Sequence, residues 1–187
     1  LSSPTAESEQ HDMSWFYKDT PEKPRILIVE DNQTQASLIA EVVRETGLYE
    51  VIIAHNGIQG LEILSRNERG FDFLTNAITC ILLDWQMPEM NGADFLKILR
   101  SKESRSPFKR HVPIVIITAY DDDDLRLLAE DSAVGLASAY LLKPLEEAEL
   151  LQIIKRIVID KEAEIMRELL VDQRSRWLQN MTERRMK

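Results

Sequence analysis

The feature that most restricts the fold is the alternation of short β-branched runs with longer stretches of helical periodicity. The runs are typical of strands that are buried on both faces of a sheet. Between them, apolar residues recur three and four positions apart, as they do along one face of a helix. We predict strands at 26–29, 51–53, 80–83, 112–117 and 139–142, with helices at 34–46, 58–64, 92–100, 122–131 and after Pro144.

Strands that alternate with helices in this way form a parallel sheet covered by helices on both faces. Crossover connections are right-handed in nearly all such units. We therefore predict an α/β fold with a doubly wound, five-stranded parallel sheet. In sheets of this kind the functional site lies beyond the carboxyl ends of the strands.

Composition and charge exclude several classes of function. The net charge of −9 argues against nucleic-acid binding, so we expect no direct DNA binding by this chain. The longest apolar runs are too short to span a bilayer, and residues 1–24 contain no apolar core of a signal peptide. The single cysteine, Cys80, allows no intrachain disulfide, and no Cys/His spacing indicates zinc. We expect a cytoplasmic protein with no membrane association.

Polar side chains follow four of the predicted strands at the point where each strand ends. Glu30 and Asp31 follow the first strand, Asp84 the third, Thr118 the fourth and Lys143 the fifth. Carboxylates that are crowded together repel one another, and a divalent cation removes this penalty. Carboxylates, a carbonyl and water are ligands that suit Mg²⁺. The pattern therefore indicates a metal site that also receives an anion.

Each of these residues also has a purely structural interpretation. An acidic pair after a strand can cap the next helix, and Asp84 can form a turn before Pro88. Thr118 alone is more often structural, and Lys143 alone is more often a solvated charge. The functional interpretation is preferred because all of them occur together, each at the end of a predicted strand.

These residues resemble the receiver domains of two-component response regulators. The resemblance covers about 25–159 and depends on Glu30-Asp31, on the run from Asp84 to Gly92, on Thr118-Ala119 and on Lys143-Pro144. It implies a flavodoxin-like receiver fold. It also implies a phosphorelay function, in which a sensor histidine kinase or a histidine phosphotransfer domain is the partner.

The resemblance implies a role for each site residue. Asp84 accepts the phosphoryl group. Asp31, Asp84 and the backbone carbonyl of Gln86 hold Mg²⁺, and Glu30 acts chiefly through a water on the metal. Lys143 neutralises charge on the phosphoryl oxygens, and Thr118 hydrogen-bonds one of them after transfer. A cis peptide before Pro144 is expected to direct Lys143 into the site.

The same resemblance suggests how phosphorylation switches a binding surface. Thr118 would move toward the phosphoryl group, and the ring of Tyr140 would fill the space it leaves. The face formed by the fourth helix, the fifth strand and the fifth helix would then change shape for a partner. The alternative is that Tyr140 is simply a residue that favours strands.

Three connections look longer than is usual in this family, at 66–79, 101–111 and 132–138. The basic 101–111 stretch could meet an acidic partner, although a solvated loop is the simpler interpretation. The run of four aspartates at 121–124 is interpreted as the start of a helix rather than as a second metal site.

We divide the chain into an N-terminal tail at 1–24, a receiver domain at 25–159 and a C-terminal helical extension at 160–187. The extension contains neither Gly nor Pro, and Ile159, Ala163, Met166, Leu170, Gln173 and Trp177 form a rough heptad seam. We interpret it as a continuation of the last helix. It would form a homodimer or connect to a downstream output domain, or else it would pack back on its own domain.

Two other functions compete with the receiver interpretation. A Mg²⁺-dependent aspartyl-phosphate hydrolase also uses an Asp nucleophile after a strand, but usually has a second Asp two residues later, where this chain has Gln86. A vestigial receiver that serves as an interaction or dimerisation scaffold is the second alternative. We expect no enzyme in the ordinary sense, because the chemistry is limited to the domain's own phosphorylation and dephosphorylation.

Overall fold

The computed structural model describes residues 23–67, 78–105, 111–119 and 137–161. Within these ranges the strands form one parallel sheet with the order β2-β1-β3-β4-β5. This order confirms the predicted five-stranded parallel sheet. The strands are β1 (Arg25–Val29), β2 (Glu50–Ala54), β3 (Ile78–Asp84), β4 (Ile114–Thr118) and β5 (Ala139–Leu142).

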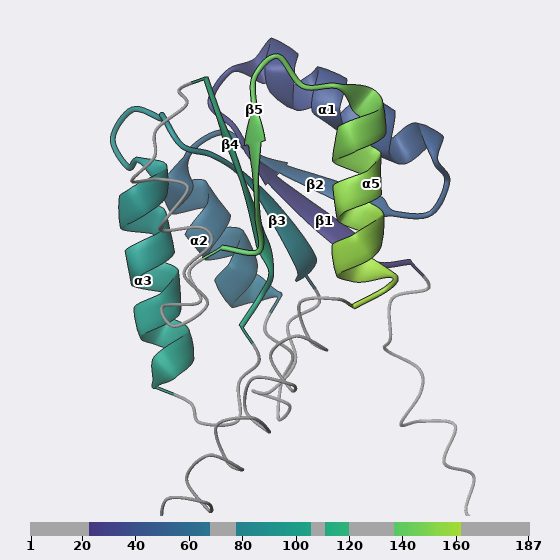
Figure 1. Ribbon diagram of the computed structural model, residues 1–187. Coiled ribbons are helices and arrows are strands. Elements are labelled where there is room, and N and C mark those ends of the chain that lie inside the picture. The colour runs from purple at the N-terminus through teal and green to yellow at the C-terminus, as the bar shows by residue number, and fades with distance from the viewer. Residues whose placement is uncertain (1–22, 68–77, 106–110, 120–136, 162–187) are drawn as a thin grey trace, which may run out of the picture.

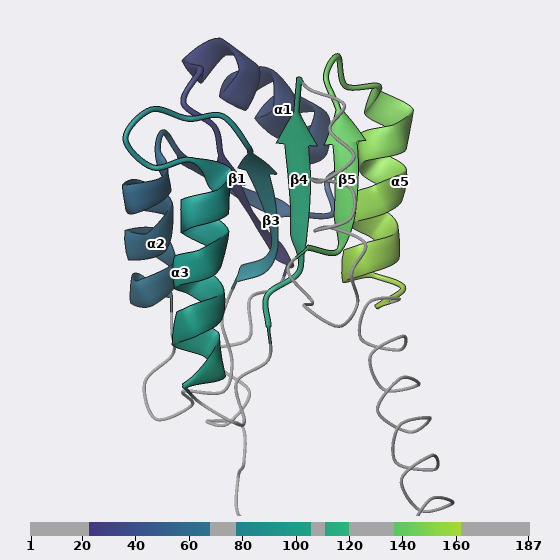
Figure 2. The same cartoon turned by 60° about the vertical axis from the view of Figure 1, so that its left-hand side comes forward.

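Helices cover both faces of the sheet, as predicted. Figures 1 and 2 show α2 and α3 on one face and α1 and α5 on the other. All the strands point the same way, so their carboxyl ends lie along one edge, which is uppermost in both views. The helices described are α1 (Gln33–Glu45), α2 (Gly57–Arg66), α3 (Gly92–Ser104) and α5 (Glu147–Val158).

Alternate residues of the central strands supply two separate cores. Leu27, Ile81 and Ile116 face α2 and α3, where they pack with Phe95. Ile26, Leu82 and Ile117 belong to the other core with α1 and α5, where they pack with Ile154. Both faces of the sheet are thus apolar, which explains why the strands appear in the sequence as continuous apolar runs rather than alternating ones.

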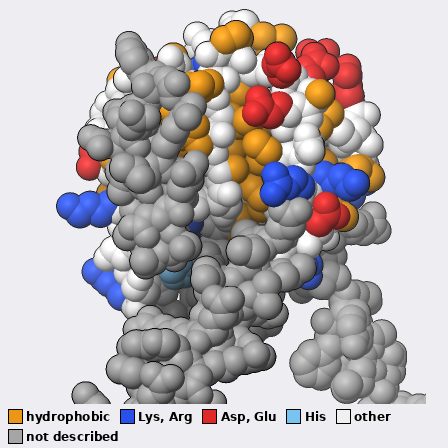
Figure 3. Space-filling view, in the orientation of Figure 1, with side chains coloured by type: hydrophobic (Ala, Val, Ile, Leu, Met, Phe, Trp, Pro, Cys, Tyr) orange, Lys and Arg blue, Asp and Glu red, His pale blue; other side chains and the backbone are white. Residues whose placement is uncertain are grey.

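Asparagine side chains begin three of the helices. Asn32 caps α1, Asn56 caps α2 and Asn91 caps α3, each through hydrogen bonds from backbone amides of the first turn. Helix α1 is followed by Gly47, whose φ of 67° is tolerated by glycine without steric cost. Acidic residues lie in the first turn of α5 and basic residues in its last turn, and both interact favourably with the helix dipole. Figure 3 shows this charge separation along the helix.

The end of α3 differs from the prediction. The helix continues to Ser104 instead of stopping near residue 100, because a buried ion pair holds its last turn. Arg100 and Glu103 are 7% and 1% exposed, and Arg100 Nη1 lies 2.6 Å from Glu103 Oε2. Glu103 Oε1 accepts from the backbone amide of Val112, and Arg100 Nη2 donates to the carbonyl of Val112. Part of the predicted basic loop is therefore a helical turn that is fastened to the chain leading into β4.

The last helix also differs from the prediction at its end. Helix α5 ends at Val158, and Lys161 has a φ of 52°. A left-handed residue interrupts an α-helix, so the expected unbroken continuation is wrong at this point. The heptad seam beyond it lies outside the described residues. So do the tail at 1–22, the helix expected at 122–131, the aspartates at 121–124 and most of the long connections. None of the helices in the described ranges is long and apolar enough to cross a membrane.

Candidate functional site

Four neighbouring strands deliver the site residues to the carboxyl edge of the sheet. Glu30 directly follows β1, Asp84 is the last residue of β3 and Thr118 is the last residue of β4. The register pairs Thr118 with Leu142 at the end of β5, and the amide of Lys143 donates to the carbonyl of Thr118 at 2.7 Å. The parallel topology therefore brings together residues that are far apart in the sequence.

The ammonium of Lys143 joins two buried carboxylates. Its Nζ lies 2.8 Å from Glu30 Oε2 and 3.0 Å from Asp84 Oδ1. Glu30 is only 2% exposed and Asp84 only 5%, so both carboxylates are largely removed from water. The peptide bond between Lys143 and Pro144 is cis, as predicted.

Three carboxylates form a cluster that is compatible with a metal ion. One oxygen each from Glu30, Asp31 and Asp84 lies within 4.8 Å of the others, and Asp31 is the most exposed of the three. The helix-cap interpretation of the acidic pair is not supported, because Asn32 accepts hydrogen bonds from the amides of Thr34 and Gln35. The acidic pair therefore does not cap the first turn of α1, although Glu30 Oε1 accepts a hydrogen bond from the backbone amide of Asn32 at 3.3 Å.

Electrostatics at the site reflect the balance between burial and the lysine. Burial raises the pKa of Glu30 and of Asp84, and the hydrogen bonds and charge of Lys143 oppose this shift only in part. For Lys143 itself, burial would lower the pKa, but its two carboxylate partners together raise it. One ammonium therefore does not fully compensate the carboxylates, and a further cation would stabilise them.

The two residues of the predicted switch lie on the same face of the sheet. Tyr140 is half-buried, packs against the core under α2 and α3, and is in register with Ile116. Side chains alternate along β4, so Thr118 is on the same face as Ile116. Thr118 is fully buried. This placement is compatible with a coupled movement of the two residues.

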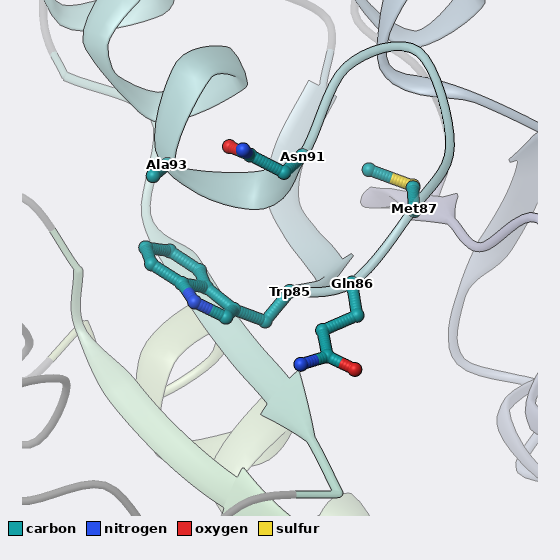
Figure 4. Close-up of a pocket in the computed structure, with 5 residues that line it drawn as sticks. All are labelled: Trp85, Gln86, Met87, Asn91 and Ala93. Carbon is teal, nitrogen blue, oxygen red and sulfur yellow. The ribbon is translucent and has the colours of Figure 1, made fainter.

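The β3–α3 loop (residues 85–91) extends from Asp84 to the start of α3. Gln86 is exposed, and its backbone hydrogen-bonds the carboxylate of Asp84. In Figure 4 the ring of Trp85 extends toward the start of α3, and Gln86 points away from Met87. Gly92 permits this packing, since a Cβ there would lie 2.7 Å from the Trp85 ring and 2.9 Å from its Cα. The contact between Trp85 and Gly92 is therefore close, while Trp85, Gln86, Met87, Asn91 and Ala93 line a pocket beside it.

Comparison with known proteins decides the family. The family model for the response regulator receiver domain matches residues 26–155, which is more than half of the chain. The chain belongs to the response regulator receiver domain family. The predicted resemblance is thereby confirmed, and the receiver domain takes part in two-component signalling, where such domains interact with histidine kinases and phosphotransfer proteins.

Relatives of this receiver domain include both long and short proteins. It is 33% identical over 134 residues to the transcriptional regulatory protein CpxR of Escherichia coli, covering 72% of this chain and 49% of CpxR. It is 29% identical over 133 residues to the chemotaxis protein CheY-3 of Vibrio cholerae, covering 71% of this chain and 90% of CheY-3. The chain thus spans about half the length of CpxR and most of the length of CheY-3.

A solved structure agrees with the fold of the receiver domain. A response regulator receiver domain protein from Clostridium thermocellum matches with a TM-score of 0.59 and 27% identity, covering 75% of this chain and 98% of that one. The flavodoxin-like receiver fold is therefore shown both by the sheet order and by comparison.

The sequence indicated the charged residues of the site but not the neighbouring residues that pack around them. Asn32, which caps α1 in place of the acidic pair, could have been recognised from the sequence, because Asn is a common N-cap before an apolar periodic stretch. The close packing of Gly92 on Trp85, and of Gly57 on Met90, had no signal in the sequence. Both contacts join segments whose proximity depends on the tertiary fold.

Proposed function

We propose that Asp84 of this receiver domain accepts a phosphoryl group from a phosphohistidine and that Mg²⁺ is required. The observation that carries the proposal is the arrangement around Asp84: its buried carboxylate lies beside two other carboxylates and accepts a hydrogen bond from Lys143. A carboxylate nucleophile, a cation site and a fixed ammonium are the groups that phosphoryl transfer to an aspartate needs.

The transfer exchanges one bond to phosphorus for another. A carboxylate oxygen of Asp84 bonds to phosphorus while the bond from phosphorus to the donor's imidazole nitrogen breaks, and that nitrogen keeps the electron pair. Lys143 is already held 3.0 Å from Asp84, so its charge is in place before the phosphoryl oxygens arrive. A preorganised charge of this kind stabilises the transition state without reorganisation.

The residues present fit a Mg²⁺ ion. Asp31, Asp84 and the carbonyl of Gln86 would hold it, and Glu30, which also bonds Lys143, would act chiefly through a water on the metal. All of these ligands are oxygens, as Mg²⁺ prefers. The ion would supply positive charge that neutralises the phosphoryl oxygens. The raised pKa values of Glu30 and Asp84 support this fit, because they indicate carboxylates that lack sufficient positive charge.

A groove beside the site suggests where the donor binds. It lies between α1 and the start of α5, and Lys143 belongs both to the groove and to the site. Leu38 on its α1 side is 58% exposed, so a partner seated on the groove would bury apolar surface there. We propose that a helical domain carrying the phosphohistidine covers this groove. The groove is lined by Gln35, Leu38, Ile39, Val42, Lys143, Pro144, Leu145, Glu147 and Leu150.

The proposed output is a change of surface upon phosphorylation. Phosphorylation places about two negative charges at a fixed point beside Thr118. A hydrogen bond from the Thr118 hydroxyl to the phosphoryl group would move the end of β4, and Tyr140 on the same face would follow. The shared face of these two residues supports this coupling.

The alternative functions are less well supported by the site. An aspartyl-phosphate hydrolase needs an acid–base group close to the nucleophile, and the residue two positions after Asp84 is the exposed amide Gln86. We therefore propose no separate substrate turnover. A vestigial scaffold would not need a lysine that joins two buried carboxylates, whose desolvation costs stability.

Intact-mass measurement tests the proposal directly. The protein is incubated with Mg²⁺ and acetyl phosphate, in parallel with Asp84→Asn and with Asp94→Asn as a matched control on the exposed start of α3. We expect one added phosphoryl mass in the wild type and in the control but none in Asp84→Asn, and none in any sample with EDTA. Equal labelling of Asp84→Asn and wild type would reject Asp84 as the acceptor.

A further inference from the structure

A methionine of the β3–α3 loop rests directly on the first residue of α2. A Cβ added to Gly57 would lie 2.8 Å from Sδ of Met90, 2.9 Å from its Cγ and 3.1 Å from its Cβ. Real side chains do not approach so closely, so any residue other than glycine at position 57 would have to displace Met90. Gly57 and Met90 therefore form a contact that only a missing side chain permits.

The backbone of Gly57 does not itself require glycine. Gly47 is the described glycine with a positive φ, and Gly57 is an ordinary first helical residue behind the Asn56 cap. Alanine would favour a helix there more than glycine does. The close approach of Met90 is therefore the structural reason for a glycine at this position.

Three side chains of the β3–α3 loop pack against the rest of the domain, and Met90 is the last of them along the chain. Met87 is 7% exposed and lies in the core under α2 and α3. Trp85 packs on Gly92 at the start of α3. Between Met87 and Gly92, Glu89 has a φ of 66° and the amide of Met90 donates to the carbonyl of Pro88 at 2.7 Å. This tight turn places Met90 against α2. Gln86 lies within this fastened segment.

We propose that Met90, seated on Gly57, is a positioning residue for the metal site. It holds the β3–α3 loop against the first turn of α2 and thereby keeps the Gln86 carbonyl in place for Mg²⁺. The inference rests on the proposed function, since it assumes that this carbonyl is a ligand. Contacts that support metal ligands from outside commonly contribute about 10-fold or more to metal affinity.

The variant Gly57→Ala separates positioning from stability. Calorimetric titration of the full chain with Mg²⁺ should show an affinity about 10-fold weaker than that of the wild type. The melting temperature in EDTA should not fall, because alanine favours the helix and Met90 can move away. Phosphorylation by acetyl phosphate should be slow at low Mg²⁺ and should recover at saturating Mg²⁺, as expected for a lost positioning contact.

A double-mutant cycle with Met90→Ala tests whether the two residues act together. Met90→Ala should weaken Mg²⁺ binding by itself, and adding Gly57→Ala to it should have less than about a twofold further effect, since the contact is already lost. Additive effects would overturn the inference. The control is Gly47→Ala, where no atom lies within 4 Å but φ is 67°, so stability should fall while Mg²⁺ affinity is unchanged.

The results distinguish this inference from the proposed function. If the wild type binds Mg²⁺ and takes up phosphoryl groups but Gly57→Ala binds Mg²⁺ equally well, only the positioning role of Met90 is wrong. If the wild type binds no Mg²⁺, the proposed metal site fails and this inference fails with it.

Discussion

Lys143 and Asp84 are 59 residues apart in the sequence, yet Nζ of Lys143 lies 3.0 Å from Oδ1 of Asp84. Asp84 ends β3 and Lys143 follows β5, and β4 lies between these two strands in the sheet. The same ammonium also bonds Glu30, so a single positive charge serves two carboxylates that are almost entirely buried. This shared charge determines how the site should respond to substitution.

Lys143→Met should destabilise the domain by about 3 kcal/mol, at the low end for removing one partner from a buried ion pair. The reason is that Glu30 and Asp84 would remain buried without their shared ammonium. Urea denaturation in EDTA measures the change. Lys97→Met, on the exposed side of α3, is the matched control and should stay near the wild type. A stability equal to that of the control would show that the ion pairs are not formed in solution.

Asp84→Asn should stabilise the domain when no metal is present. Burial raises the pKa of Asp84, which means that its charged form is disfavoured in the folded state despite the hydrogen bond from Lys143. We expect a melting temperature above that of the wild type, because the neutral amide avoids the cost of burying the charge. Thermal unfolding in EDTA checks this.

Mg²⁺ should make the wild type melt at a higher temperature than Asp84→Asn, which reverses the order expected in EDTA. An ion that binds the folded state stabilises it by mass action, and Asp84 is one of its proposed ligands. The melting temperature of the wild type should therefore rise with Mg²⁺ concentration, while that of Asp84→Asn should change little. A rise of the same size in both would place the bound Mg²⁺ elsewhere on the molecule.

Glu103→Ala should be among the more damaging substitutions outside the site. Glu103 is almost fully buried, pairs with Arg100 and accepts a hydrogen bond from the amide of Val112. Its loss should cost about 3–5 kcal/mol, because it removes the carboxylate from a buried arginine. Urea denaturation should show this loss, whereas the exposed neighbour Lys102 should tolerate alanine within about 0.5 kcal/mol. Similar stabilities for the two variants would contradict the ion pair.

Cys80 should be inert toward thiol reagents in the folded protein. Burial raises the pKa of its thiol to about 12, and the reactive species is the thiolate. A disulfide reagent at pH 8 should label no thiol in the native protein and one per chain in guanidinium, since Cys80 is the single cysteine. Rapid labelling of the native protein would show that β3 opens easily.

The same raised pKa predicts a loss of stability at alkaline pH. The folded state keeps the proton of Cys80 to a higher pH than the unfolded state, so the unfolded state binds fewer protons between pH 9.0 and about 12. The contribution of the neutral buried thiol is complete below this window and is lost as the pH rises through it. Cys80→Ala should show a weaker decline across the window in urea denaturation at each pH.

Most of the fold could be predicted because the central strands are buried on both faces. Runs such as Ile26–Val29 and Ile114–Ile117 have one interpretation in a chain that also contains helical periodicity. The ends of the elements were harder to predict. The last turn of α3 depends on the ion pair between Arg100 and Glu103, and α5 ends before the left-handed Lys161 although neither Gly nor Pro marks the place.

The sequence predicted which residues form the candidate site but not which of them contact one another. The positions of Glu30, Asp84 and Lys143 at strand ends were visible in the sequence, because parallel strands share one carboxyl edge. The sharing of one ammonium between two carboxylates was not visible, and neither was the Met90–Gly57 contact. The roles of Thr118 and Tyr140 as a switch remain predictions.

The sequence by itself determined where the described strands and helices lie along the chain, the family, and the residues that reach the functional edge. These follow from local patterns, since periodicity, caps and motifs involve residues that are neighbours in the chain. The tertiary structure alone decided which of these groups touch and how deeply each is buried. Those properties set the pKa of Asp84 and the need for glycine at position 57, because both depend on atoms that only folding brings together.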